Sequence, residues 1–577
     1  MWAEPAPRLP LGKWTGPETE QALVAHGLSF TPVPPATPDR APVWYPGHIA
    51  VTAASADAKR LTLQLDGRAE QGSRMAQAAA IALPPGLTLS DVKVTRTPYR
   101  LALTLRFHAE AGHSYRFAKL VALSRDGWGG DAAADLALAE AARQCGFEAL
   151  LAEHRAAWSR LWQADIRIAG DAHAQQVVHS DLYYLLASST ADTAWPIGAC
   201  GLTPGYLGHA FWVSDSWVFP ALLLLHPERA KSLVMFRTRT LAAAQARARA
   251  HGFAGAMYPW ESDPENGSEQ VPHFAAVLGD REIHVNAGVT IAQWQYWLAT
   301  GDRDWLRVSG WPVIREVARF WASRAQWNAA RRAYDIAHVT SVDESYTDVN
   351  NDTFTNVSAR RALRIAGLAA AVLGERPDPA WAAVADKLVV PFDAAGQHHL
   401  YFDPSTPQRT DSWGGSAMPM LALPSLDEPM SDTVRRNAFA FAIGSIAAGQ
   451  EPNTRGPPPI SLMAASSRDT GEAVKWIERS HAGDVLKPPF NVRTETASNS
   501  TVYFTTGSGG FIQNILFGTT GLRLHDEGLQ PAYAPLLLPG WNSVSFTGVQ
   551  LRGKTFDIVV HRDATGSARL DQHATAR

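Results

Sequence analysis

The feature of this sequence that most constrains its fold is the spacing of its apolar residues, which changes at about residue 131 and again at about residue 521. Between about 46 and 125 the apolar residues alternate with polar ones. A period of two that is broken by Gly and Pro predicts antiparallel strands in a β-sandwich. The two clearest alternating sets are Leu61, Leu63 and Leu65, and Leu101, Leu103, Leu105 and Phe107.

From about 131 onward the apolar spacing becomes three and four residues, which is typical of helices. In the segment after Glu282, for example, apolar residues from Val285 to Tyr296 fall on one helical face. About ten helices in succession predict an all-α toroid of paired helices. Further helices are expected near 138–164, 173–189, 216–226, 228–251, 311–327, 356–373, 379–389, 432–448 and 468–479, and after Gly509-Gly510.

After Gly521 the alternation returns, as in Leu522 and Leu524, and it predicts a small C-terminal β-domain. The expected domains are an N-terminal sandwich, a helical linker, a helical catalytic domain and this β-domain. Their expected ranges are 1–130, 131–165, 166–520 and 521–577. Three smaller expectations concern Pro-rich and Gly-rich stretches: residues 1 to about 45 irregular or extended, 455–459 a loop, and 507–510 a tight turn that opens the last helix.

Composition limits the classes of partner. The 577 residues are 46% hydrophobic and 19% charged, which is ordinary for a globular protein with a large core. A net charge of −3 offers no basic excess for nucleic acid or a membrane surface, and no apolar run is long enough to span a bilayer. Cys145 and Cys200 have no metal-ligand spacing and are expected to be buried thiols, so neither a metal nor a cofactor is expected. No signal peptide is visible. The sequence leaves open the compartment and whether the protein forms a homodimer.

Four loops in the helical region carry aromatic, carboxyl and amide groups together. A sugar pocket needs this combination, because a ring face stacks on the sugar and polar groups bind its hydroxyls. Each loop alone is better explained as a capped helix start, and His284 alone as a core histidine, but the occurrence of four such loops in the same part of the chain favours a pocket. The candidate residues are Trp212 and Asp215 in the first loop, Trp260 and Glu261 in the second, His284 and Asn286 in the third, and Asp343 and Glu344 in the fourth, which spans 340–356.

Glycosidic bond cleavage usually requires two carboxyl groups. Glu344 and Glu495 are the candidate pair, one as the acid that protonates the leaving oxygen and the other as the base that activates water. The competing interpretations are a solvated loop with an N-cap for Glu344, and a surface ion pair with Arg493 for Glu495.

These motifs resemble glycoside hydrolase family 65, which contains disaccharide phosphorylases, acid trehalases and hydrolases of α-1,2-linked glucosides. The resemblance covers about residues 140 to 560, and the motifs occur in the family's order. It is nearest to the hydrolase branch that acts on glucosylgalactosylhydroxylysine and kojibiose-type substrates. The matching residues are Gly208-His209 through Asp215-Ser216-Trp217, Trp260-Glu261-Ser262, Ile283-His284-Val285-Asn286, Asp343-Glu344, Val349-Asn350-Asn351, Phe354-Thr355-Asn356, Gly310-Trp311 through Arg324, and Thr506 through Phe511.

The resemblance implies an (α/α)6 barrel between an N-terminal antiparallel β-sandwich and a small C-terminal β-domain. It also implies that Glu344 is the general acid. In the family's phosphorylases a His and a Ser-rich phosphate loop occupy the region matching Thr494-Glu495, so Glu495 here implies a general base with water as the nucleophile. The glucose subsite would be lined by Trp212, Asp215, Trp260, Glu261 and His284.

The sequence also departs from the family pattern. The acid loop, usually Pro-Asp-Glu-Tyr-His, is Val342-Asp343-Glu344-Ser345-Tyr346, and the aspartate of a Phe-Trp-Asp pattern is Val213. The N-terminal sandwich is also shorter than the family's. The leading hypothesis is an inverting α-glucosidase acting on an oligosaccharide or glycoside, with α-1,2 linkages as candidates. The alternatives are a phosphorylase of the same fold and a catalytically inactive sugar-binding protein.

Overall fold

The structure is a computed structural model that describes residues 19–29, 49–69, 72–125, 131–203, 205–272, 275–344, 346–393, 395–396, 418–426, 428–445, 456–498 and 503–574. The chain forms two compact units, Met1–Trp162 and Gln163–Arg577. Among the expectations above, those for the run at 31–35, Ser345, Arg455 and the helix end at 446–448 lie outside the described residues.

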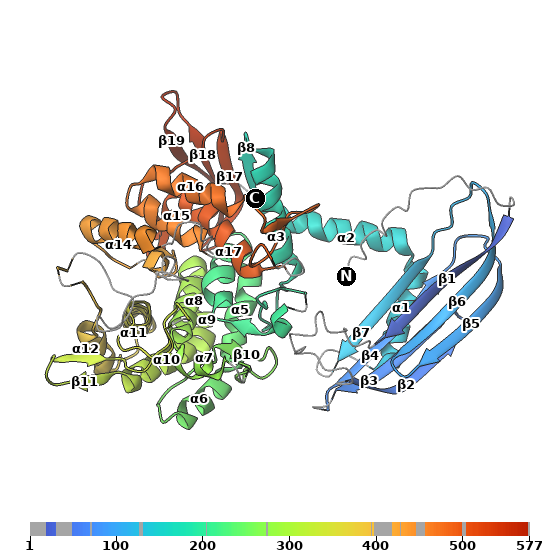
Figure 1. Ribbon diagram of the computed structural model, residues 1–577, viewed down its shortest axis with the longest axis horizontal. Coiled ribbons are helices and arrows are strands. Elements are labelled where there is room, and N and C mark those ends of the chain that lie inside the picture. The colour runs from blue at the N-terminus through green and yellow to red at the C-terminus, as the bar shows by residue number, and fades with distance from the viewer. Residues whose placement is uncertain are drawn as a thin grey trace. The chain divides into compact units, whose positions relative to one another are not determined.

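The described residues of the N-terminal unit form two antiparallel sheets (Figure 1). Leu28, Leu63, Leu65, Leu103 and Leu105 come from both sheets and belong to one buried core. The alternation between 46 and 125 therefore predicted the strands in that range, because their inward faces are the apolar ones, whereas it did not predict the strand Thr19–Ser29 that carries Leu28. One sheet has the order β1-β6-β5 and the other β2-β3-β4-β7, with bounds β1 Thr19–Ser29, β2 Ile49–Asp57, β3 Thr62–Ala69, β4 Arg74–Ala82, β5 Leu89–Thr97, β6 Arg100–Glu110 and β7 Ala118–Arg125.

Two helices follow these sheets where the sequence predicted a single helix. Helix α1 (Ala132–Cys145) ends at Gly146, whose φ of 89° favours glycine, and α2 (Phe147–Leu161) begins directly after it. Helix α1 packs on the second sheet, where Ala139 meets alanines of β4 and β7. The expectation that Cys145 is buried is wrong. Cys145 lies six residues after Ala139, about 240° around the helix, and is exposed.

The second unit is mainly helical and carries a sheet and several short hairpins (Figure 1). At its centre α8 packs against α5, α10 and α11, and α17 packs against α3 and α4. The helices are α3 Ala172–Ala187, α4 Phe219–Leu223, α5 Pro227–Arg239, α6 Leu241–Ala250, α7 Ala276–Arg281, α8 Val285–Thr300, α9 Arg303–Trp305, α10 Trp311–Arg324, α11 Thr353–Leu373, α12 Pro379–Lys387, α14 Asp432–Ser445, α15 Pro457–Ser466, α16 Thr470–Ser480 and α17 Thr505–Gln513.

Short one-turn helices and two-stranded pairs join these helices. Among the described residues three segments are π-helical, a widened form that is frequent near functional sites. They are η2 Ser214–Val218, η4 Leu306–Gly310 and η6 Asn514–Gly518, and the 3-10 turns are η1 Gly205–Gly208 and η5 Met418–Ala422. The pairs are β9 Ala210–Phe211 with β10 Glu261–Ser262, β11 Gln326–Asn328 with β12 Ala333–Asp335, β13 Leu486–Lys487 with β14 Val492–Arg493, and β15 Leu522–His525 with β16 Gly528–Pro531.

A four-stranded antiparallel sheet joins the two ends of this unit. Its order is β19-β18-β17-β8, with β17 Ser543–Leu551, β18 Lys554–Arg562 and β19 Ala568–Ala574. Strand β8 (Asp165–Ala169) comes from the start of the unit and pairs with β17, so that Phe546 lies opposite Ile166. The C-terminal strands were predicted, whereas the contribution of β8 was not.

The structure corrects two expectations about loops. Pro457–Pro459 begin helix α15 instead of forming a loop. Proline is tolerated in the first turn of a helix, because backbone N–H groups there have no acceptor within the helix and proline's lack of one costs nothing. Gly507–Gly510 lie inside α17 and do not form a turn before it. A Cβ on Gly509 would lie 2.5 Å from the Trp217 carbonyl oxygen, so glycine here allows two backbones to approach closely.

We expect Gly509→Ala to lower the free energy of unfolding by about 1–3 kcal/mol, because the added methyl group overlaps the Trp217 backbone. Gly367→Ala is the matched control. Gly367 lies inside α11 with no atom within 4 Å of an added Cβ, so alanine there should stabilise by up to about 1 kcal/mol. Urea unfolding of both variants measures the difference, and equal effects would contradict the close-approach explanation.

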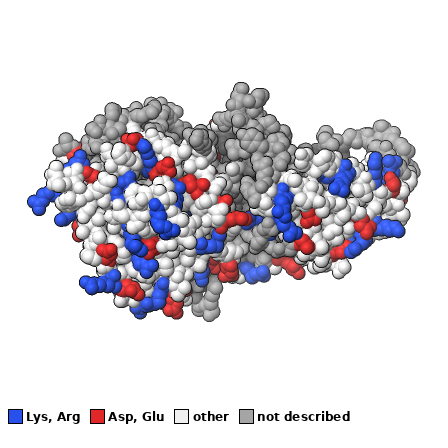
Figure 2. Space-filling view, turned by 90° about the horizontal axis from the view of Figure 1, so that it is seen from below, with Lys and Arg blue, Asp and Glu red and all other residues white. Residues whose placement is uncertain are grey.

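No helix within the described ranges is long and apolar enough to cross a membrane. On the face seen in Figure 2, acidic and basic side chains are interspersed.

Candidate functional site

The centre of the candidate site is a buried group of three rings from three of the predicted loops. Trp212 follows β9, His284 precedes α8, and Phe354 lies in the first turn of α11. The His284 ring stands edge-to-face with Trp212 at 4.8 Å and with Phe354 at 5.1 Å between centroids. Loops that are far apart in the sequence therefore meet at one place.

The Glu344 turn is fastened to the start of α11. Ser341 N–H donates to the Tyr346 carbonyl at 2.9 Å, which closes the turn around the half-buried Glu344. Ser341 Oγ donates to Asp352 Oδ1 at 2.9 Å, and Asp352 caps the helix by accepting from Thr355 N–H at 2.8 Å. The candidate acid is therefore held beside the helix that carries Phe354.

The segment that carries Glu495 is held by a buried ion pair. Arg493 Nη2 lies 2.7 Å from Asp181 Oδ2 on α3, and both side chains are at most 1% exposed. Arg493 Nη1 also donates to the Ser480 carbonyl at 2.6 Å. The alternative in which Glu495 is a surface carboxylate paired with Arg493 is therefore wrong, because the Arg493 guanidinium is buried and pairs with Asp181 instead.

Glu495 itself is half-buried, and its partner is Tyr206. The Tyr206 hydroxyl donates to Glu495 Oε2 at 2.8 Å. The Tyr206 ring meets Phe211 edge-to-face at 5.3 Å, and Phe211 in turn meets Trp260 at 5.2 Å. Trp212 belongs to the ring group beside the Glu344 turn, and the residue before it, Phe211, contacts the Tyr206 that binds Glu495. These two neighbouring residues therefore connect the surroundings of the two candidate carboxyl groups.

The remaining predicted site residues all have protein partners. Because each is buried, these bonds fix the side chains in place. Whether any of the four also touches a sugar stays a prediction. Asp215 pairs with Arg237 at 2.6 Å, Glu261 with His209 at 2.7 Å and His284 with Glu282 at 2.9 Å, and Asn286 accepts from Tyr258 N–H at 2.6 Å.

Sequence patterns missed several residues that build the site. Glu269 accepts from the backbone N–H groups of Trp260 and Glu261, both at 2.9 Å, and pairs with Arg247 at 3.2 Å. Burial raises the pKa of Glu269, which the cation and these hydrogen bonds oppose. Tyr206 stands only two residues before the predicted loop at 208–217, and this nearness was the one available signal.

Asp352 makes the stability of the site depend on pH. Burial raises its pKa to about 7, and the charge of the neighbouring Asp343 acts in the same direction. The folded state therefore keeps a proton that the unfolded chain loses near pH 4. The stabilising contribution is complete at low pH and is lost as pH rises from about 4 through 7.

We therefore expect Asp352→Asn, which stays neutral and keeps a capping oxygen, to be more stable relative to the natural protein at pH 8 than at pH 5. Urea midpoints at the two pH values measure this difference. Asp378→Asn, at the exposed N-cap of α12, is the control for capping alone. An Asp352→Asn difference that does not change with pH would refute the prediction.

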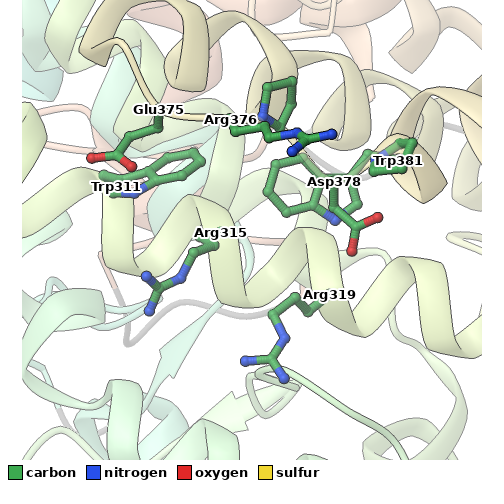
Figure 3. A pocket seen from close by; sticks show the side chains of 9 residues that line it. Trp311, Arg315, Arg319, Glu375, Arg376, Asp378 and Trp381 are labelled. Atoms are coloured by element: carbon green, nitrogen blue, oxygen red, sulfur yellow. The ribbon is translucent and has the colours of Figure 1, made fainter.

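A cavity of about 410 Å³ lies elsewhere in the second unit and contains none of the predicted site residues (Figure 3). Trp311, Arg315 and Arg319 of α10 form one wall, and residues from Glu375 to Trp381 form the other. Within the part of the chain that the structure describes, no cluster of three or more His, Cys, Asp or Glu side chains could hold a metal ion.

Comparison with known proteins agrees with these motifs. Residues 179–405 match the model of the glycosyl hydrolase family 65 central catalytic domain. The chain is 31% identical over 497 residues to the mouse protein-glucosylgalactosylhydroxylysine glucosidase, which covers 83% of this chain and 69% of that protein. The chain belongs to glycosyl hydrolase family 65.

A more similar relative by identity is a kojibiose hydrolase from Mucilaginibacter mallensis, at 38% over 419 residues, which are 72% of this chain and 60% of that one. The chain spans about 60% of the length of the kojibiose hydrolases that it matches. A solved structure of a human-microbiome protein assigned as a kojibiose phosphorylase superposes with a TM-score of 0.79 at 17% identity. The match covers 96% of this chain and 75% of that one, and it supports the family's fold.

Proposed function

We propose that this protein is an inverting glycoside hydrolase that releases glucose from α-glucosides, with α-1,2-linked substrates such as kojibiose as the first candidates. The proposal includes an (α/α)6 barrel formed by the helices of the second unit. The relatives named above supply the substrate class. The observation that carries the proposal is the surroundings of Glu495, a half-buried carboxylate that accepts from Tyr206 beside the Phe211–Trp212 dipeptide.

In the proposed reaction Glu344 gives its proton to the glycosidic oxygen as the bond from that oxygen to C1 breaks. Water attacks C1 from the opposite face, and Glu495 takes the proton that the water loses. Glucose then leaves in the β form, and proton exchange with solvent restores both carboxyl groups. Room for the water requires a separation of about 6.5–9.5 Å between the two carboxyl groups. Trp212, Asp215, Trp260, Glu261, His284 and Asn286 would surround the glucose.

The burial of Arg493 favours water over phosphate as the nucleophile. A phosphate nucleophile needs cationic or N–H partners beside the base. Arg493, two residues from Glu495, is instead buried against Asp181 and the Ser480 carbonyl. This arrangement supports hydrolysis.

Incubation with kojibiose and other glucose disaccharides, with and without phosphate, tests the proposal by proton NMR of the first product. We expect phosphate-independent release of β-glucose. Initial α-glucose would contradict inversion, and phosphate-dependent β-glucose 1-phosphate would identify a phosphorylase. Binding without turnover would identify a sugar-binding protein.

A further inference from the structure

We propose that Tyr206 is a positioning residue that orients Glu495 for the attack of water, an inference that rests on the proposed function. The Tyr206 hydroxyl donates to one oxygen of Glu495, Oε2, at 2.8 Å. A general base must present a carboxylate oxygen to the water in a fixed direction. With Oε2 held by Tyr206, the rotation of the carboxylate is restricted and Oε1 is the oxygen that receives the proton.

The backbone around Tyr206 is strained in a way that serves this contact. Tyr206 and Leu207 have φ values of 53° and 57°, and Gly208 follows at 74°. Two successive non-glycine residues in the left-handed region are unfavourable, so the surrounding structure must hold them there. We call the described residues 198–203 and 205–208 the Tyr206 loop, and contacts at its base supply this support.

The Tyr206 loop is fastened at its base to the start of α17. A Cβ on Gly198 would lie 3.0 Å from the Cα of Gly208, so the two ends of the loop approach closely. Thr505 N–H donates to the Ala199 carbonyl, and Thr505 Oγ1 donates to the Gly198 carbonyl, both at 2.9 Å. The loop and the segment that carries Glu495 are thus both anchored in the same part of the second unit.

The tip of the loop meets Glu495 and is more accessible than its base. Tyr206 is 42% exposed, and its ring rests against Phe211. The buried Cys200 in the same loop interacts electrostatically with Glu495. Burial and the Glu495 charge together raise the pKa of Cys200 to about 12. A tyrosine hydroxyl held this way acts on the carboxylate through one charge-assisted hydrogen bond.

Tyr206→Phe removes the hydroxyl and keeps the ring against Phe211. We expect kcat for kojibiose to fall about 10- to 100-fold, the size of one hydrogen bond to a charged group, with little change in KM. Tyr334→Phe, in the β11–β12 hairpin, is the matched control and should keep full activity. Thermal unfolding of both variants should match that of the natural protein.

α-Glucosyl fluoride shows through which carboxyl group Tyr206 acts. Fluoride leaves without being protonated, so loss of the general acid matters little for this substrate, whereas loss of the base still slows the attack of water. The Tyr206→Phe defect should persist with the fluoride. In a Glu495→Gln background, Tyr206→Phe should cause no further loss.

Full kcat in Tyr206→Phe would overturn the inference, and so would a defect that disappears with α-glucosyl fluoride or that multiplies with Glu495→Gln. If Tyr206→Phe also raises KM and lowers the unfolding temperature, the residue is structural and the inference fails. A natural protein that turns over no α-glucoside would instead contradict the proposed function itself.

Discussion

Glu344→Gln should lower turnover of kojibiose on the order of 10²–10⁴-fold while leaving substrate binding nearly unchanged. The reason is that glutamine cannot give a proton to the leaving oxygen, although it fills the same space in the turn that Ser341 and Asp352 hold at the start of α11. Steady-state kinetics with kojibiose and calorimetric binding to the inactive variant measure the two quantities.

The choice of substrate separates Glu344 from Glu495. With α-glucosyl fluoride, Glu344→Gln should recover most of its activity, whereas Glu495→Gln should stay slow because water still needs a base. Glu375→Gln, beside the cavity of Figure 3, is the matched control and should behave as the natural protein. Full turnover of kojibiose by Glu344→Gln would remove this residue from the mechanism.

Asp181→Ala should lower the free energy of unfolding by about 3–5 kcal/mol, because it leaves the buried Arg493 guanidinium without its counterion. Ser508 Oγ, which donates to Asp181 Oδ1 at 2.8 Å, would lose its partner as well. Urea unfolding measures the loss. Activity should fall with it, because Arg493 fixes the backbone two residues before Glu495.

An exposed ion pair provides the comparison for Asp181. Asp432 lies 3.2 Å from Arg435 and is 53% exposed, so Asp432→Ala should cost at most about 1 kcal/mol. If the two substitutions destabilise the protein equally, the Asp181–Arg493 pair is not the anchor of the Glu495 segment.

Local sequence patterns predicted most of the fold. Alternation found the strands that carry Leu63 and Leu103, and helical spacing found α8, because apolar residues there recur with the period of the element. The patterns failed where local rules have two outcomes. Pro457–Pro459 can end a helix or begin one, and Gly509 can form a turn or permit close packing.

The sequence predicted which loops meet at the candidate site, but not which side chains pair there. The loops at Trp212, His284 and Phe354 do meet, as a shared pocket requires. The pairing of Arg493 with Asp181 and of Glu495 with Tyr206 joins segments about 300 residues apart, and no periodicity reports such contacts. The nearest charge in the sequence was therefore a poor guide to the partner of Glu495.

Strand β8 has a consequence for how this protein is made. Its partner β17 is translated only after all the helices from α3 to α17, so β8 leaves the ribosome with an unpaired edge and waits until β17 has been synthesised. An unpaired edge recruits other strands. Nascent chains in which 543–574 have not yet been made are thus expected to need chaperones, and a chain terminated before β17 should aggregate more readily than the full chain.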